Sequence, residues 1–163
     1  MTVNAIPSAD AGLNVTTCSN VPATLTASGG SSYQWSTGDL SASTTVNPQE
    51  SETYWVTVTA NGCSAIDFVD VLVLTAPVVN LGANADLCNN LTMTLDAGDN
   101  MQTYEWSDGS AGQTLLVDPS ATGLGVFTYS VTVTAFNGCS GNDAITITIE
   151  DCAGVEENPE AIT

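Results

Sequence analysis

Apolar and polar residues alternate along four segments of the chain, in the pattern of strands that bury one face. Valine, tyrosine or isoleucine takes every second position in residues 54–59, 69–73, 129–134 and 145–149, and most positions between them are polar. Successive side chains of a strand point to opposite faces of its sheet, so this alternation predicts half-buried β-strands. No segment shows the period of an amphipathic helix, and we expect no helix.

Turn signals separate these segments. Asn61-Gly62 and Asn137-Gly138 each stand between two alternating segments, and Asn-Gly is a strong hairpin signal because both residues accept a positive φ. Six or seven short strands per half, with a turn about every 8–12 residues, predict an immunoglobulin-like (Ig-like) antiparallel β-sandwich. In the first half we expect strands at residues 12–17, 23–28, 32–36, 43–47, 53–60 and 66–74.

The chain contains one unit twice. Tyr-x-Trp-Ser begins at Tyr33 and again at Tyr104, Asn-Gly-Cys-Ser begins at Asn61 and again at Asn137, and further matches follow the same order. Ordered self-similarity of this kind is the signature of tandem repeats. The predicted domains are two homologous sandwiches and an acidic linker tail, over residues 1–76, 77–152 and 153–163.

Each unit carries an aromatic pair that we expect in its core. By alternation, Tyr33 and Trp35 point to one face of their strand, as do Tyr104 and Trp106. A tryptophan on the third strand that faces the core is typical of Ig-like sandwiches.

The last hairpin of the first unit breaks the symmetry of the repeat. Alternation around inward-facing valines turns Trp55, Leu72 and Leu74 outward, and we expect Trp55 to lie across from Asp70 or Leu72. An exposed apolar stripe tends to mark a contact surface, so Trp55, Leu72 and Leu74 are candidate contact residues. The alternative is that a neighbouring loop or domain of the same chain covers them. At the places equivalent to Trp55, Asp70 and Leu72, the second unit has the polar residues Ser130, Thr146 and Thr148.

The order of these motifs resembles that of the Ig-like (PKD-like) repeats of large Bacteroidota surface and secreted proteins. The shared pattern is Cys, Leu-Thr-Ala, Tyr-x-Trp-Ser-x-Gly, Val-x-Pro, Tyr-x-Val-Thr-Val-Thr and Asn-Gly-Cys-Ser, and the resemblance covers about residues 7–158. It implies export by the type IX secretion system, a multidomain parent protein, and a role as spacer, stalk or adhesive module.

Composition excludes several functions. The chain has 18 Asp and Glu residues and no Lys, Arg or His, which gives a formal net charge of −18. Binding to nucleic acid or to anionic membranes relies on Lys and Arg, so we expect neither partner. Because most enzyme mechanisms need Lys, His or Arg, we expect no enzyme, no catalytic residue and no organic cofactor.

Calcium is the one cofactor that the composition leaves open. Asp96, Asp99, Asn100 and Asp108 form the densest acidic group, and Ca²⁺ prefers oxygen ligands. Their spacing is not that of an EF-hand, and the first repeat lacks the equivalent carboxylates. We therefore expect solvated loop carboxylates and no bound metal.

The five disulfide candidates are Cys18, Cys63, Cys88, Cys139 and Cys152. Repeat symmetry favours the pairs Cys18–Cys63 and Cys88–Cys139. In an Ig-like sandwich, however, the first loop and the tip of the last hairpin lie at opposite ends, which makes Cys88–Cys152 a rival pairing. Sequence alone does not decide the connectivity. Cysteine-rich β domains of this kind are typical of an oxidising, extracellular setting.

Three functions fit these observations. The leading one is a non-catalytic extracellular structural spacer or adhesion module of a larger secreted or cell-surface protein. The alternatives are a carbohydrate-binding module that uses Trp55, and a self-assembling filament subunit whose exposed edge strands pair between copies. The expected partners are other domains of the parent protein, with a glycan or a cell-surface protein as external partners.

Charge crowding carries a prediction of its own. Eighteen carboxylates without a side-chain cation repel one another, which should raise their pKa values in the folded state. A folded-state pKa above the unfolded one predicts greater thermal stability near pH 4.5–5 than at pH 8 in low salt.

Overall fold

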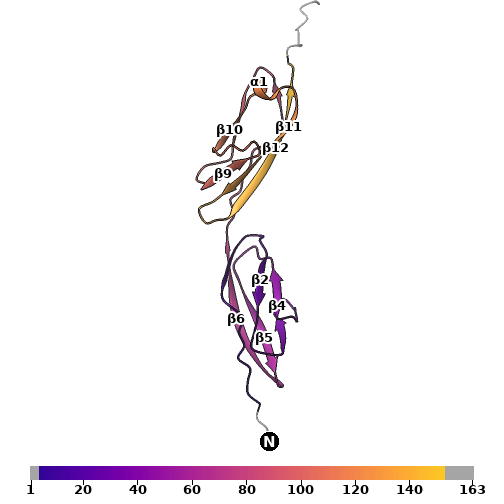
Figure 1. The fold of residues 1–163 in the computed structure, drawn as a ribbon, viewed down its shortest axis with the longest axis vertical. Coiled ribbons are helices and arrows are strands. Elements are labelled where there is room, and N and C mark those ends of the chain that lie inside the picture. The colour runs from indigo at the N-terminus through magenta and orange to yellow at the C-terminus, as the bar shows by residue number, and fades with distance from the viewer. Residues whose placement is uncertain (1–3, 153–163) are drawn as a thin grey trace, which may run out of the picture. The chain divides into compact units, whose positions relative to one another are not determined.

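The computed structural model describes residues 4–152, and the chain divides into two units that meet between Ala76 and Pro77 (Figure 1). The acidic tail expected at residues 153–163 lies outside the described residues. Each unit is an Ig-like β-sandwich, which confirms the predicted fold class.

The first unit contains a four-stranded and a two-stranded sheet. The larger sheet has the strand order β1-β6-β5-β3 and the smaller sheet pairs β2 with β4. The strands are β1 (Val15–Cys18), β2 (Ala23–Thr26), β3 (Ser32–Trp35), β4 (Ser43–Val46), β5 (Glu52–Ala60) and β6 (Cys63–Leu74).

The second unit repeats this topology, with the sheet orders β7-β12-β11-β9 and β10-β8. A four-residue helix, α1 (Pro119–Thr122), precedes the longest hairpin of the unit. The strands are β7 (Ala85–Cys88), β8 (Met93–Asp96), β9 (Thr103–Trp106), β10 (Thr114–Val117), β11 (Gly125–Thr134) and β12 (Ser140–Glu150).

The first strand of each unit runs parallel to the last one, whereas the other pairings are antiparallel. Where these short parallel pairings end, side chains take the place of backbone groups as hydrogen-bond acceptors between the first and the last segment of each unit. Asn14 and Asn84 accept backbone N–H groups of the last strand at 3.0 and 2.9 Å. Asp67 and Asp143, on the last strand, accept N–H groups of the preceding segment at 2.8 and 2.7 Å. Both units therefore close this sheet edge in the same way.

Each core is built around the expected tryptophan. Trp35 and Trp106 are both 2% exposed, and each indole N–H donates to a backbone carbonyl, that of Ser41 at 3.1 Å and that of Gly112 at 2.8 Å. The alternating valines and isoleucines of the last hairpin are buried against the indole. The predicted core positions of Trp35 and Trp106 are confirmed.

The helix α1 is a feature that the sequence analysis missed. Between the matching prolines and tyrosines, Pro48 and Tyr54 in the first unit and Pro119 and Tyr129 in the second, the second unit has four more residues, and α1 begins at Pro119. Asp118 caps the helix by accepting the Ser120 N–H at 2.9 Å. One turn is too short to show a helical period, so the expectation of no helix was wrong at this point.

Candidate functional site: the outer face of β5 and β6

Four large apolar side chains lie exposed on the outer face of β5 and β6, and we call this set the apolar face. The exposed fractions are 46% for Trp55, 57% for Ile66, 62% for Phe68 and 52% for Leu72. Trp55 and Phe68 are directly paired across the two strands. Aromatic side chains on opposing positions of one sheet face are within contact distance, so this pair is the centre of the apolar face.

The register of β5 against β6 is shifted by two residues from the first expected pairing, with Asp70, and by four from the second, with Leu72. Trp55 lies across from Phe68, and not from Asp70 or Leu72, because the tight turn at Asn61-Gly62 pairs Ala60 with Cys63. Ile66 and Phe68 were missed, although they occupy the same alternating positions as Leu72. Continuing the alternation from Leu72 back to the turn would have found both.

Leu74 does not belong to the exposed set. It is half-buried at the end of β6, where it pairs with Cys18 of β1. Leu72, two residues earlier in β6, pairs with Thr16 and is exposed.

One hydrogen-bonded polar pair lies within the apolar face, between Phe68 and Leu72, and a second borders it near the turn. The Thr53 hydroxyl donates to Asp70 Oδ1 at 2.6 Å, and the hydroxyls of Thr59 and Ser64 lie 2.8 Å apart. A shallow pocket of about 210 Å³ adjoins Leu72 and includes Glu52 in its lining. The site therefore combines apolar contact with hydroxyls and carboxylates that lie within it and beside it.

The same face of the second unit lacks these four large apolar side chains. The positions equivalent to Trp55, Ile66, Phe68 and Leu72 hold Ser130, Asn142, Ala144 and Thr148, and the Thr128 and Thr146 hydroxyls lie 3.2 Å apart between them. One topology thus carries an apolar outer face in one copy and, apart from the exposed Val126, a mostly polar outer face in the other. The fold does not require the apolar residues.

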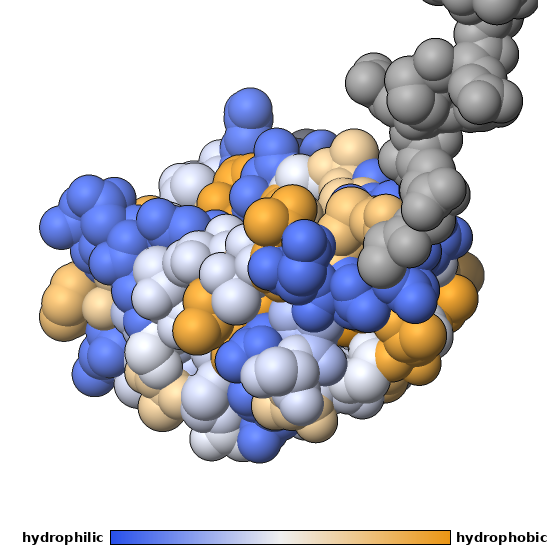
Figure 2. Space-filling view, turned by 90° about the horizontal axis from the view of Figure 1, so that it is seen from above, coloured by the Kyte–Doolittle hydropathy of each residue, from blue (hydrophilic) through white to orange (hydrophobic). Residues whose placement is uncertain are grey.

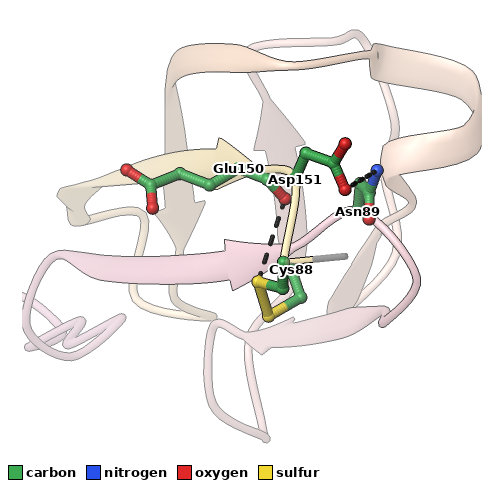
Figure 3. Close-up of a disulfide and its surroundings, with 5 residues drawn as sticks. Cys88, Asn89, Glu150 and Asp151 are labelled. Atoms are coloured by element: carbon green, nitrogen blue, oxygen red, sulfur yellow. Dashed lines mark hydrogen bonds between the residues drawn. A yellow bond between two sulfur atoms is a disulfide. The ribbon is translucent and has the colours of Figure 1, made fainter. Parts of the chain in front are cut away.

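One disulfide joins Cys88 to Cys152, with its Cα atoms 5.4 Å apart (Figure 3). Cys88 ends β7, which runs parallel to β12, so the ends of both strands lie together, and Cys88 pairs with Glu150. Asn89 donates to Asp151 Oδ1 at 3.3 Å beside the disulfide. The rival pairing is therefore the one that forms, and the symmetric pair Cys88–Cys139 was wrong.

Cys63 is a free thiol, so the expected pair Cys18–Cys63 was also wrong. The parallel pairing places Cys18 beside Leu74, at the opposite end of β6 from Cys63. Eleven steps along a strand, at about 3.3 Å each, separate the two ends by roughly 36 Å, far beyond the reach of a disulfide. Cys18 and Cys139 each take part in a disulfide.

Local hydrogen bonds hold the pKa of five aspartates below the usual value. The donors are Ser41 to Asp39, Gln113 and Gly98 to Asp96, Ser110 to Asp108, Ser120 to Asp118, and Leu81 and Ala144 to Asp143. Hydrogen bonds to the charged form favour ionisation. The direction is opposite to the rise expected from charge crowding, because these turn and edge contacts act at shorter range than the repulsion.

The candidate calcium ligands serve as turn and side-chain acceptors. Asp96 accepts from the Gly98 N–H and from Gln113, both at 2.9 Å, and Asp108 accepts from Ser110. Within residues 4–152, no three His, Cys, Asp or Glu side chains come together as a metal site. Calcium binding, which Asp99 and Asn100 would also serve, stays untested, and the expectation of no bound metal stays a prediction.

On the face seen in Figure 2, hydrophilic side chains separate the apolar side chains into small areas.

Among residues 4–152, no helix has the length and apolar character needed to cross a membrane.

No protein-family model matches the chain, and no curated protein matches it. Solved structures of tandem Ig domains do match the chain. The two-domain IG1+IG2 structure of DIP-gamma has 11% identity, covers 90% of this chain and 98% of its own, and has a TM-score of 0.38. The titin domains z1z2 in complex with telethonin have 14% identity, with 92% and 99% coverage and a TM-score of 0.35. Extracellular domains 3–5 of Drosophila OTK have 14% identity, with 89% and 60% coverage and a TM-score of 0.39.

Proposed function

We propose that the chain is a non-catalytic module of a larger extracellular protein, in which it acts as a structural spacer and adhesion module. The observation that carries this proposal is the apolar face of the first unit, which the second unit lacks. Full burial of one such side chain contributes about 1.5–3 kcal/mol. Four partly exposed side chains therefore leave several kcal/mol for a partner surface to recover.

The proposed location is the cell surface or the secreted fraction. The Cys88–Cys152 disulfide supports an oxidising compartment, since disulfides rarely persist in the cytosol. The motif resemblance to type IX-exported Bacteroidota proteins supports the same location and a multidomain parent.

A protein partner fits the apolar face better than a second copy of the chain. Every copy carries a formal charge of −18, so two copies repel each other. Salt screens this repulsion beyond the Debye length, which is about 8 Å at physiological ionic strength. A partner with an apolar centre and basic residues around it would meet both the side chains of the apolar face and the carboxylates of Asp70 and Glu52.

Phage display with counter-selection tests this proposal. A random peptide library is selected on the wild-type chain and depleted on the variant W55S/F68A, which carries the residues of the second unit at both positions. We expect enriched peptides that combine apolar and basic residues. Equal recovery from both proteins would contradict a contact role of the apolar face.

Carbohydrate binding is the second candidate, and the exposed Trp55–Phe68 pair is the observation that favours it. Aromatic rings beside acceptor groups can stack on sugar rings and bind their hydroxyls. A glycan array probed with the wild-type chain and with W55S/F68A separates the two candidates, because only a carbohydrate-binding module gives signals that the variant loses. Light scattering that rises with concentration would instead support the filament alternative.

A further inference from the structure

The second unit contains a groove of about 560 Å³ between β10, α1 and β11. Its principal lining residues are Asp108, Leu115, Leu116, Asp118, Phe127 and Tyr129. The size lies within the range of small-ligand sites. This groove is unrelated to the apolar face, which belongs to the first unit.

Aromatic rings form part of the groove wall. Phe127 and Tyr129 are half-buried and pack against the core of the second unit. Among the described residues, the Tyr129 hydroxyl has no hydrogen-bond partner, whereas the hydroxyl of its counterpart Tyr54 donates to Glu52 at 2.9 Å. The groove thus presents ring surface together with an unengaged hydroxyl.

Two carboxylates add negative charge to the same groove. Ser110 donates to Oδ1 of Asp108, and Ser120 donates to Oδ1 of Asp118. These contacts hold the pKa of both carboxyls below the usual value, so both remain ionised at neutral pH. The chain has no Lys, Arg or His to neutralise them.

The groove lining is particular to the second unit. By the repeat alignment, Asp108, Leu116, Asp118 and Phe127 replace Thr37, Thr45, Asn47 and Glu52 of the first unit. Two carboxylates and two apolar side chains therefore stand where the first unit has three neutral polar residues and one glutamate. As with the apolar face, the shared fold does not call for this change.

We propose that this groove binds an arginine side chain of a protein partner. A guanidinium group donates up to five hydrogen bonds in a planar fork, which suits Asp108 and Asp118 as acceptors. Its flat face stacks on aromatic rings such as Phe127 and Tyr129. Leu116, which is 60% exposed, offers apolar contact to the residue beside the arginine in the partner chain.

Titration followed by nuclear magnetic resonance tests the proposal on the full chain. The probes are two capped dipeptides, acetyl-Leu-Arg-amide and acetyl-Leu-citrulline-amide, which differ in charge and hardly in shape. We expect saturable shifts of the amide signals of residues 107–108, 116–118 and 127–129 with the arginine peptide. The citrulline peptide should bind at least about tenfold more weakly, because a charged hydrogen bond exceeds a neutral one by that order.

The matched variant is D108T/D118N, which carries the residues that the first unit has at these positions. Asparagine is also a good helix N-cap, so α1 should persist in this variant. We expect the variant to bind the arginine peptide about tenfold more weakly than the wild type does. Unchanged amide signals in the rest of the second unit verify that it remains folded.

Three results would overturn the proposal: equal binding of the two peptides, undiminished binding by D108T/D118N, or no saturation up to about 20 mM, which is weaker than a specific site would be. The variant W55S/F68A should bind the arginine peptide as the wild type does. A failure of the groove is therefore distinguishable from a failure of the apolar face.

Discussion

The two units share strand order, edge contacts and core, yet they differ in what they present to their surroundings. The outer hairpin face is apolar in the first unit and mostly polar in the second, and the groove beside the smaller sheet is acidic and aromatic only in the second. The apolar face occurs only in the first unit and the acidic, aromatic groove only in the second. Since each unit folds without the feature of the other, the shared fold requires neither feature. Internal duplication thus separates the residues that maintain the sandwich from those available for contact.

The largest effect should come from the shared core. Trp35→Ala and Trp106→Ala each remove a fully enclosed indole, and each should lower the free energy of unfolding of its own unit by about 3–5 kcal/mol. Chemical denaturation followed by nuclear magnetic resonance reports the two units separately. Because the units are compared as equivalent sandwiches, markedly unequal losses would break the comparison.

The Cys88–Cys152 disulfide should stabilise the second unit by up to about 4 kcal/mol, the value of the chain-entropy model for a closed loop of this length. The change is Cys88→Ser with Cys152→Ser, and the signals of the first unit serve as the internal control. An unchanged unfolding midpoint of the second unit would show that the bond does not contribute to its stability.

The side chains that close the sheet edge should contribute less and do so equally. Asn14→Ala and Asn84→Ala each leave a backbone N–H of the last strand without its acceptor, which should cost about 1 kcal/mol in the respective unit. Hydrogen exchange at the amides of Asp70 and Thr146 measures the loss. Faster exchange in one unit alone would mean that the edges are not equivalent.

The pH dependence should follow the hydrogen-bonded aspartates. Their folded-state pKa values lie below the unfolded ones, so their contribution is present above the unfolded pKa and is lost as pH falls through the folded pKa. We therefore expect the melting temperature to fall as pH is lowered from about 5 to 3. A melting temperature that rises over this interval would show that these hydrogen bonds do not control the pH dependence.

Alternation along the chain was sufficient to predict the strands, the sandwich and the buried Trp35 and Trp106, because these depend on a period that each strand carries by itself. The direction of β1 against β6 depends on contacts between distant segments, and the disulfide pairing follows from that direction. Repeat symmetry was misleading for Cys63 for this reason. The apolar face was foreseen at Trp55 and Leu72. Phe68 follows the same alternation, and only its pairing with Trp55 required the register that the Asn61-Gly62 turn sets.

The apolar face itself should contribute little to stability. In W55S/F68A both positions carry the residues of the second unit, and substitutions on an exposed sheet face usually change the free energy of unfolding by about 0.5 kcal/mol or less. The reciprocal variant S130W/A144F transfers the aromatic pair to the second unit and serves as the matched control. Strong destabilisation by W55S/F68A would show that the pair maintains the fold.

Calorimetric titration of the best peptide from the counter-selected library against wild type and W55S/F68A tests the central claim most directly. If the apolar face is a contact surface, the variant should bind at least about thirtyfold more weakly, as expected when central aromatic residues of an interface are removed. Its unfolding free energy should stay within about 0.5 kcal/mol of the wild-type value. Equal affinity for the two proteins, with the variant fully folded, would contradict the claim.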